Sequence, residues 1–295
     1  MKSSAMLKAV ASAIAAVLMS VPGAAQGQGR SADRTKLYNT AKQKLLEGKQ
    51  VFSHTISGFD VERYCEEAKH YDFTWFEMQH STMTWQEVEK MIAACPRAGA
   101  IPMIRMPDEL ESSIQKATDL GVLGIIMPTV DTVEKAQATA RYARYPPEAH
   151  RSSGGGAAGR IWGVNGVNYR ETFNDNMLVV VMIETPVGVA NAYDIARVQG
   201  VDVVIIGNND LSVFSGFPQK HPRYQQMVED VRDATLKAGK MFGCAGAQYR
   251  EGYSVSKDAF FFQNGPTNDG WVNPRQRGRG FQAEGEESLT APRQP

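Results

Sequence analysis

The sequence lacks an excess of charge of either sign, because its 32 basic residues are matched by 32 acidic residues. A protein that binds nucleic acid needs a basic surface that displaces counterions from phosphates, so no DNA or RNA partner is expected. Hydrophobic residues make up 42% of the 295-residue chain, which is enough for a large core. The composition therefore favours a soluble globular protein.

Cysteine is also scarce. The chain has three cysteines, Cys65, Cys95 and Cys244, without CxxC or Cys/His metal-ligand spacing. This pattern excludes a zinc site and allows at most one disulfide. We expect all three to be small buried hydrophobic residues.

The sequence has no hydrophobic run long enough to span a membrane, and the longest one near the start is short. Lys2 and Lys8 precede an apolar stretch over residues 9–21, and small residues follow as far as Ala25. A membrane-spanning helix needs about 20 apolar residues, so the stretch favours a signal peptide over residues 1–25 rather than an anchor. We therefore expect an exported protein, periplasmic or secreted, with no membrane attachment after cleavage.

The remaining chain divides into a linker (26–40), one domain (41–271) and a polar tail (272–295) that we expect to be disordered. Within the domain, short runs that are apolar at nearly every position favour strands buried on both faces. These runs are QVFSHTIS, FTWFEMQH, IPMIRM, GIIMPTV, LVVVMIET, VDVVIIG, KMFGC and DAFFFQNG.

Segments with the apolar periodicity of a helix lie between many of these runs, for example residues 84–95, 108–120, 132–145 and 223–239. Eight strand-and-helix units of this size predict an α/β fold, a (β/α)₈ TIM barrel of about 250 residues. An open doubly wound sheet is disfavoured, because no strand is followed by GxGxxG and because polar residues follow several strands around the series instead of gathering at one crevice.

One long connection interrupts the alternation between residues 146 and 175, with SSGGGAAGR at its centre. It lacks the GK[ST] of a nucleotide-binding loop. Long loops in compact domains are often functional, so we expect a lid over the site, with Arg151 reaching the substrate.

In a TIM barrel, catalytic groups follow the carboxyl ends of strands. Glu184 ends the fifth run and Asp210 follows the sixth, and two facing carboxylates repel unless a cation lies between them. An all-oxygen ligand set predicts a hard divalent metal, Mg²⁺ or Mn²⁺. The alternative is that these acids form ion pairs with Arg105 or Arg151.

The second and third runs add candidates for proton transfer and anion binding. His80 follows Glu77 by three residues, so the carboxylate could orient the imidazole as a general base, although His80 could equally be an ordinary polar residue. Arg105 ends an apolar run, where a guanidinium needs an anion such as a substrate carboxylate or enolate.

These residues give the chain a resemblance to the HpcH/HpaI aldolase and citrate lyase family, metal-dependent pyruvate aldolases with a (β/α)₈ fold. The similarity extends from about Leu46 to Trp271. It is carried by FTWFEMQHS, IPMIRMP, LGVLGIIMPTVDTVEKAQATARYARYPPEAHR, VVMIETPVGVANAYDIARVQGVDVVIIGNNDLS and AGKMFG.

The resemblance implies that Glu184 and Asp210 bind the metal and that Arg105 steadies the enolate oxygen. His80, with Glu77 beside it, would move protons through a water. Substrate-binding positions would be Gln79, Arg105, Arg151, Asn208 and Asn209. Gln79 stands where the family usually has Glu, and Asn208 and Asn209 replace its Pro and Ala. The family's last helix is here replaced by the tail, so a homo-oligomer is possible but the oligomeric state is left open.

The implied activity is reversible cleavage of a 4-hydroxy-2-oxo acid to pyruvate and an aldehyde. Two alternatives remain open at this point. One is a lyase of the citramalyl or malyl type acting on a CoA thioester, which an exported protein would rarely meet. The other is an exported oxo-acid-binding barrel without turnover, because fold alone does not determine function.

Overall fold

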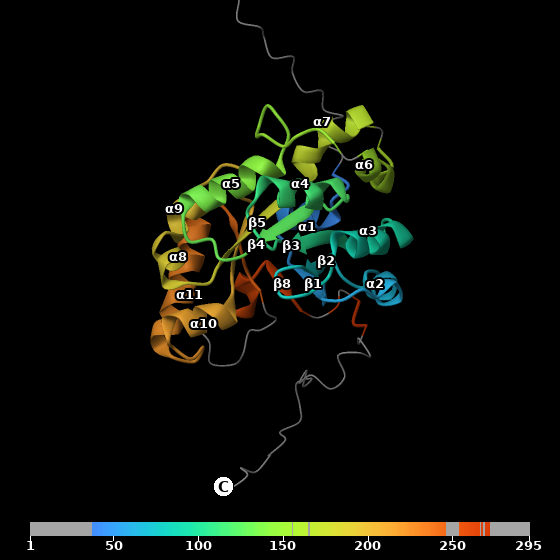
Figure 1. The fold of residues 1–295 in the computed structure, drawn as a ribbon. Helices are drawn as coiled ribbons and strands as arrows, with labels where there is room; N and C mark the ends of the chain where they lie inside the picture. Colours follow the sequence, from blue (N-terminus) through green and yellow to red (C-terminus); the bar gives the residue numbers. More distant parts are fainter. Residues whose placement is uncertain are drawn as a thin grey trace, which may run out of the picture. The chain divides into compact units, whose positions relative to one another are not determined.

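The computed structural model describes residues 37–154, 156–164, 166–245, 254–265, 267 and 269–271. They form a closed barrel of eight parallel strands in chain order (Figure 1). The strands are β1 (Val51–Ile56), β2 (Phe73–Glu77), β3 (Ile101–Arg105), β4 (Gly124–Met127), β5 (Leu178–Ile183), β6 (Val203–Ile206), β7 (Met241–Cys244) and β8 (Phe262–Asn264). The predicted TIM barrel is confirmed, and each predicted run contains one strand.

Burial explains why the strands are apolar throughout instead of alternating. Every residue of β2, β4, β5 and β6 is buried. One face of each strand packs inside the barrel, and the other is covered by the surrounding helices, so neither face meets water.

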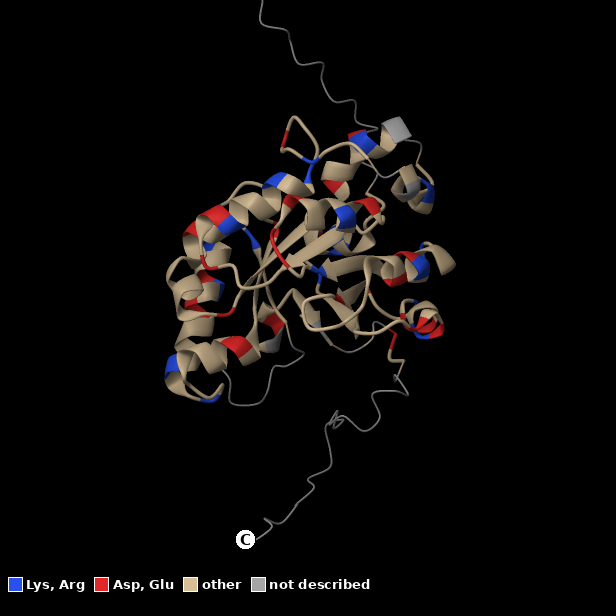
Figure 2. Ribbon diagram, viewed as in Figure 1, with Lys and Arg blue, Asp and Glu red and all other residues tan. Residues whose placement is uncertain are grey.

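The helices surround the barrel, and side chains near their ends cap the free backbone groups. Thr84 and Glu87 form a capping box at the start of the helix predicted over 84–95. The helices are α1 (Thr40–Leu46), α2 (Val61–Glu67), α3 (Trp85–Ala94), α4 (Glu111–Asp119), α5 (Val133–Ala143), α6 (Gly156–Trp162), α7 (Gly166–Asn176), α8 (Pro186–Ala190), α9 (Ala192–Ala196), α10 (Asn208–Ser215), α11 (Pro222–Lys237) and the short 3₁₀ helix η2 (Lys257–Ala259). Basic and acidic residues are interspersed along them (Figure 2).

The predicted signal peptide, the linker up to residue 36 and the tail lie outside the described residues. The last four residues of the predicted linker pack onto the barrel. Buried Asn39 caps α1 and donates from Nδ2 to the carbonyl oxygens of Leu123 (3.1 Å) and Asn176 (2.7 Å). No helix within the described ranges is long and apolar enough to span a membrane.

The connection between residues 146 and 175 is not a lid over the carboxyl ends of the strands. It contains α6 and α7 and joins the end of α5 to the start of β5. A connection from a helix to the next strand lies at the amino end of a TIM barrel, opposite the catalytic end. The Trp162 indole donates to the Gly121 carbonyl (2.8 Å) just beyond α4, which ties α6 to that end.

Two of the three cysteines are not simple buried hydrophobic residues. Cys65 of α2 and Cys95 at the end of α3 form a disulfide with a Cα–Cα distance of 5.7 Å. Sequence spacing did not reveal the pair because 30 residues separate the two cysteines. Cys244 is a buried thiol outside the disulfide, as predicted.

Candidate active site

Arg105 and Glu77 form an ion pair at the carboxyl ends of β3 and β2. The strand register places them directly opposite each other, and Arg105 Nη2 lies 2.6 Å from Glu77 Oε2. The guanidinium also lies over the Trp75 ring, 5.5 Å from its centroid, and the indole donates to Glu77 Oε2 (3.2 Å). Arg105 Nε is buried and has no hydrogen-bond partner among the described residues. Arg105 therefore has a donor available for a ligand while its charge is held in place.

Glu77 contacts the backbone after β2 and not the His80 imidazole. Glu77 Oε1 accepts hydrogen bonds from the backbone N–H groups of Gln79 (2.9 Å) and His80 (3.0 Å). The expected orientation of the imidazole by Glu77 is therefore not formed, because Arg105, Trp75 and this turn occupy the carboxylate. His80 itself is exposed at the rim of the barrel. Its role in proton transfer stays a prediction.

Glu184 directly follows β5 and is 1% exposed. Its Oε1 accepts two hydrogen bonds from Thr129, one from the backbone N–H and one from the hydroxyl, each 2.7 Å long. Its Oε2 is buried and has no partner within the described part of the chain. A Cβ at Gly207 would lie 2.2 Å from this oxygen, so only glycine allows Glu184 its position.

Asp210 lies in the first turn of α10, close enough to act electrostatically on Glu184. The pKa of Glu184 is raised, first because burial removes the carboxylate from water and further because of the negative charge of Asp210. Hydrogen bonds from Thr129 and the charge of Arg105 oppose that rise. Two adjacent acids, one with a buried oxygen that no described residue satisfies, fit a divalent cation, which would offset the cost of burial.

The alternative that these acids form ion pairs is not supported. Arg105 pairs with Glu77, and Arg151 pairs with Asp119. The described residues contain no group of three or more His, Cys, Asp or Glu side chains that could hold a metal. A metal at Glu184 and Asp210 would therefore complete its coordination with water and substrate.

Asn208 and Asn209 already contact protein groups. Asn208 donates from Nδ2 to Cys244 Sγ (2.9 Å) and accepts from the Tyr224 hydroxyl (3.0 Å), while exposed Asn209 accepts from Gln219 Nε2 (3.2 Å). Gln79 differs, because its Oε1 is buried without a partner among the described residues. Of the three predicted substrate-binding amides, Gln79 is therefore the one with a buried acceptor that no described residue satisfies.

Arg151 does not lie with the other predicted site residues. It is 3% exposed, donates to Asp119 Oδ1 (2.7 Å) and lies 4.3 Å from the ring centroids of Tyr145 and Phe173. Asp119 ends α4, and Phe173 lies in α7, so these partners are at the amino end of the barrel. The expectation that Arg151 reaches the substrate from a lid is wrong, because the connection that carries Arg151 lies at the amino end of the barrel, opposite the candidate site.

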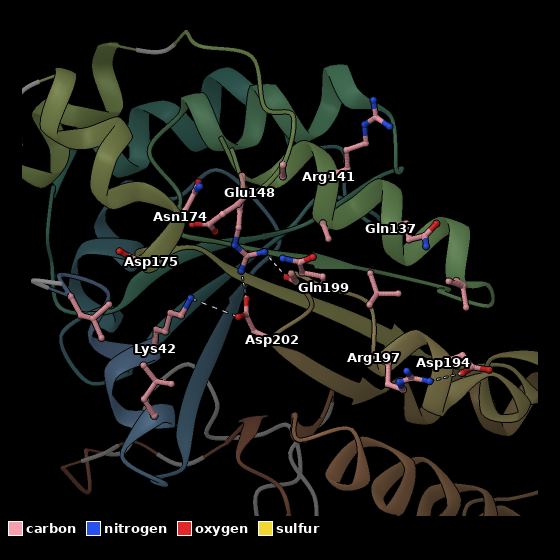
Figure 3. Close-up of a pocket in the computed structure, with 18 residues that line it drawn as sticks. Lys42, Gln137, Arg141, Glu148, Asn174, Asp175, Asp194, Arg197, Gln199 and Asp202 are labelled. Atoms are coloured by element: carbon pink, nitrogen blue, oxygen red, sulfur yellow. Dashed lines mark hydrogen bonds and ion pairs between the residues drawn. The ribbon is translucent and has the colours of Figure 1, made fainter. Parts of the chain in front are cut away.

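A cavity of about 900 Å³ opens at the same amino end and is separate from the candidate site. Lys42 and Asp202 face each other in it (Figure 3), and Arg144 also lines it. Arg144 Nη2 lies 2.6 Å from Asp202 Oδ2, and Lys42 donates to the Met177 carbonyl (2.8 Å). These charges are paired with protein groups.

Three contributors to the site were not predicted from the sequence. Thr129 and Trp75 hold Glu184 and Glu77, and Gly207 leaves room for Glu184. Thr129 had a detectable signal, because it is a polar residue at the end of the apolar run GIIMPTV. The other two act through contacts that spacing along the chain does not show.

Fold and site together define a class: a TIM barrel with a pair of acids and an arginine at the carboxyl ends of its strands, typical of an enzyme that stabilises developing negative charge. Residues 64–267 match the family described as HpcH/HpaI aldolase/citrate lyase. The chain belongs to this family and is an aldolase-type carbon–carbon lyase.

Individual relatives agree with that assignment. The chain is 31% identical over 217 residues to the 2-keto-3-deoxy-L-rhamnonate aldolase of Shigella sonnei (strain Ss046), covering 70% of this chain and 79% of that protein. It resembles an HpcH/HpaI aldolase from Desulfitobacterium hafniense DCB-2, with a TM-score of 0.69, 26% identity, and coverage of 76% and 89% of the two chains. The citrate synthase SbnG gives a TM-score of 0.65 at 26% identity, with coverage of 76% and 88%.

Proposed function

We propose that this enzyme reversibly cleaves a 4-hydroxy-2-oxo acid into pyruvate and an aldehyde, with Mg²⁺ or Mn²⁺ held by Glu184 and Asp210. The observation that carries the proposal is the buried Oε2 of Glu184, which no described residue satisfies, beside a second carboxylate. The named activity of the Shigella relative supports the substrate class, since a 2-keto-3-deoxy sugar acid carries a ketone at C2 and a hydroxyl at C4.

In cleavage, the C4 hydroxyl loses its proton, the C3–C4 bond breaks to give the aldehyde, and its electron pair forms the enolate of pyruvate. Protonation at C3 then completes pyruvate. A divalent ion at the two acids would supply Lewis-acid stabilisation of the negative charge. Arg105 Nε donates a hydrogen bond to the enolate oxygen, and Glu77 holds the guanidinium for this purpose. His80 moves the protons through a water.

Pyruvate release tests this proposal. The purified protein is incubated with Mn²⁺ or Mg²⁺ and a panel of 4-hydroxy-2-oxo acids that includes 2-keto-3-deoxy sugar acids. We expect turnover that chelator and Glu184→Ala abolish and that Asp194→Ala preserves, because Asp194 is an exposed carboxylate at the amino-end cavity. Tight oxo-acid binding without turnover would instead support a binding protein. Activity restricted to CoA thioesters would support a lyase of the citramalyl or malyl type.

We also propose that the protein is exported. The basic and apolar start of the chain supports this, and so does the Cys65–Cys95 disulfide, because disulfides persist in oxidising compartments. Sequencing the amino terminus of the mature protein, with thiol trapping of a fractionated cell, tests it. A cytosolic protein that retains Met1 and has reduced cysteines would refute it. Light scattering checks whether the chain forms the homo-oligomer left open above.

A further inference from the structure

Thr129 has an unusual backbone conformation for its residue type. It follows β4 and Pro128, and its φ is +49°, in the left-handed region. A β-branched side chain is disfavoured there, because its Cβ substituents crowd the backbone. Such a conformation persists only when the surrounding structure enforces it, and it is concentrated at functional sites.

Contacts on both sides hold Thr129 in this conformation. Met127 is paired with Val181 of β5, and the Val130 N–H donates to the Met182 carbonyl (2.9 Å). Between these points the chain leaving β4 has two residues, Pro128 and Thr129, while β5 has one, Met182. The extra length makes the chain bulge beside β5, at the end where Glu184 emerges.

The bulge directs two donors from one residue to one atom. The Thr129 N–H and hydroxyl both donate to Glu184 Oε1 at 2.7 Å. Glu184 Oε2 receives no hydrogen bond from the described residues and lies in the space that the missing Cβ of Gly207 leaves. The two carboxylate oxygens therefore have different tasks, one for anchoring and one for binding.

We propose that Thr129 is a positioning residue that anchors Glu184 through Oε1 and thereby presents Oε2 to the cation shared with Asp210. The inference rests on the proposed function, because it needs a metal at these two acids. Thr129 does not contact the cation itself, since its donors face Glu184. The role falls to a residue that the sequence alone did not single out.

Metal affinity without substrate is the primary test, with Mn²⁺ titrated into the protein by calorimetry or by the electron paramagnetic resonance of free Mn²⁺. Thr129→Val keeps the branched shape but removes the hydroxyl, and we expect about a tenfold weaker Mn²⁺ affinity, the effect of losing one hydrogen bond to a charged group. Thr129→Ser keeps both donors, so its affinity should stay within about threefold of the parent value.

A glycine at position 129 distinguishes the anchoring of Glu184 from an effect on fold stability. Thr129→Gly removes the hydroxyl but accepts a positive φ, so we expect weak Mn²⁺ binding together with an equal or higher melting temperature. Arg97→Gly is the matched control, because Arg97 is exposed and also has a positive φ (+60°) but lies before β3 at the amino end. It should leave Mn²⁺ affinity unchanged.

A positioning role also predicts that excess Mn²⁺ restores most of the turnover of Thr129→Val, whereas damage to the fold would not be rescued. Mn²⁺ binding by Thr129→Val as tight as that of the parent would overturn the proposal. Equal losses in Thr129→Val and Thr129→Ser would do the same. If the parent protein itself does not bind Mn²⁺, the proposed function fails as well, and this result is distinct from the other two.

Discussion

The charged cluster of the amino-end cavity and the candidate site at the carboxyl end differ in how their polar groups are paired. In the amino-end cavity, Asp202 forms an ion pair with Arg144 and another with Lys42, the second of which Figure 3 shows. At the carboxyl end, Gln79 Oε1, Arg105 Nε and Glu184 Oε2 are buried without a hydrogen-bond partner among the described residues.

A buried polar group without a hydrogen-bond partner costs free energy of folding, and a bound ligand can satisfy such a group. The cavity of about 900 Å³ lies at the amino end, where Asp202 compensates the charges of Arg144 and Lys42, and this favours the carboxyl-end residues as the site. In TIM barrels the amino end serves stability and the carboxyl end serves chemistry. Variants at either end should therefore separate the two properties.

The largest effect is expected for Glu184→Gln at the carboxyl end. The change keeps the shape but removes a metal-binding charge, so turnover should fall on the order of a thousandfold or more. Stability at neutral pH should be unchanged or higher, because the raised pKa of Glu184 means that its ionised form disfavours the folded state. Steady-state kinetics and urea unfolding of apoprotein check both. Retention of more than a tenth of the activity would contradict the site assignment.

The opposite pattern is expected for Asp202→Asn at the amino end. Asp202 contacts Arg144 and accepts from the Val179 N–H (2.7 Å), so the change leaves a largely buried guanidinium without its counter-charge. We expect the free energy of unfolding to fall by about 2 kcal/mol, since Asp202 is partly exposed, with turnover within about twofold. Asp194→Asn, whose Arg197 partner is 3.9 Å away and exposed, is the control. A large loss of turnover in Asp202→Asn at a temperature where it is folded would break the contrast.

A smaller effect is expected in the barrel wall between the two ends. His54 is 1% exposed, with Nδ1 2.7 Å from Glu67 Oε2 and Nε2 2.7 Å from Thr74 Oγ1. Burial lowers its pKa below the usual 6.5, although Glu67 opposes the shift.

The unfolded chain then takes up a proton more readily than the folded protein, so this group's stability contribution is present above pH 6.5 and is lost as the pH falls below it. His54→Gln should make unfolding free energy less dependent on pH below 6.5, by at most about 1.4 kcal/mol per pH unit, the limit for one proton. Denaturant unfolding across that range measures the slope. Exposed His150→Gln is the control. An unchanged slope in His54→Gln would show that His54 does not supply the dependence.

The sequence by itself determined the barrel. Parallel strands that are buried on both faces need apolar residues at nearly every position, so all eight could be located from apolar runs in the sequence. It also determined that Glu184, Asp210 and Arg105 follow strand ends, because the fold places every such end on one rim. Glu184 and Asp210 do act on each other electrostatically.

Tertiary structure alone decided which groups meet. Strand register pairs Glu77 with Arg105 and takes that carboxylate away from His80, and the packing of α2 on α3 joins Cys65 to Cys95. The direction of the chain after α5 places Arg151 at the far end of the barrel. The left-handed conformation of Thr129 depends on the path that the chain takes beside β5 after it leaves β4. Each of these depends on distances between segments remote along the chain, and local apolar periodicity carries no information about such distances.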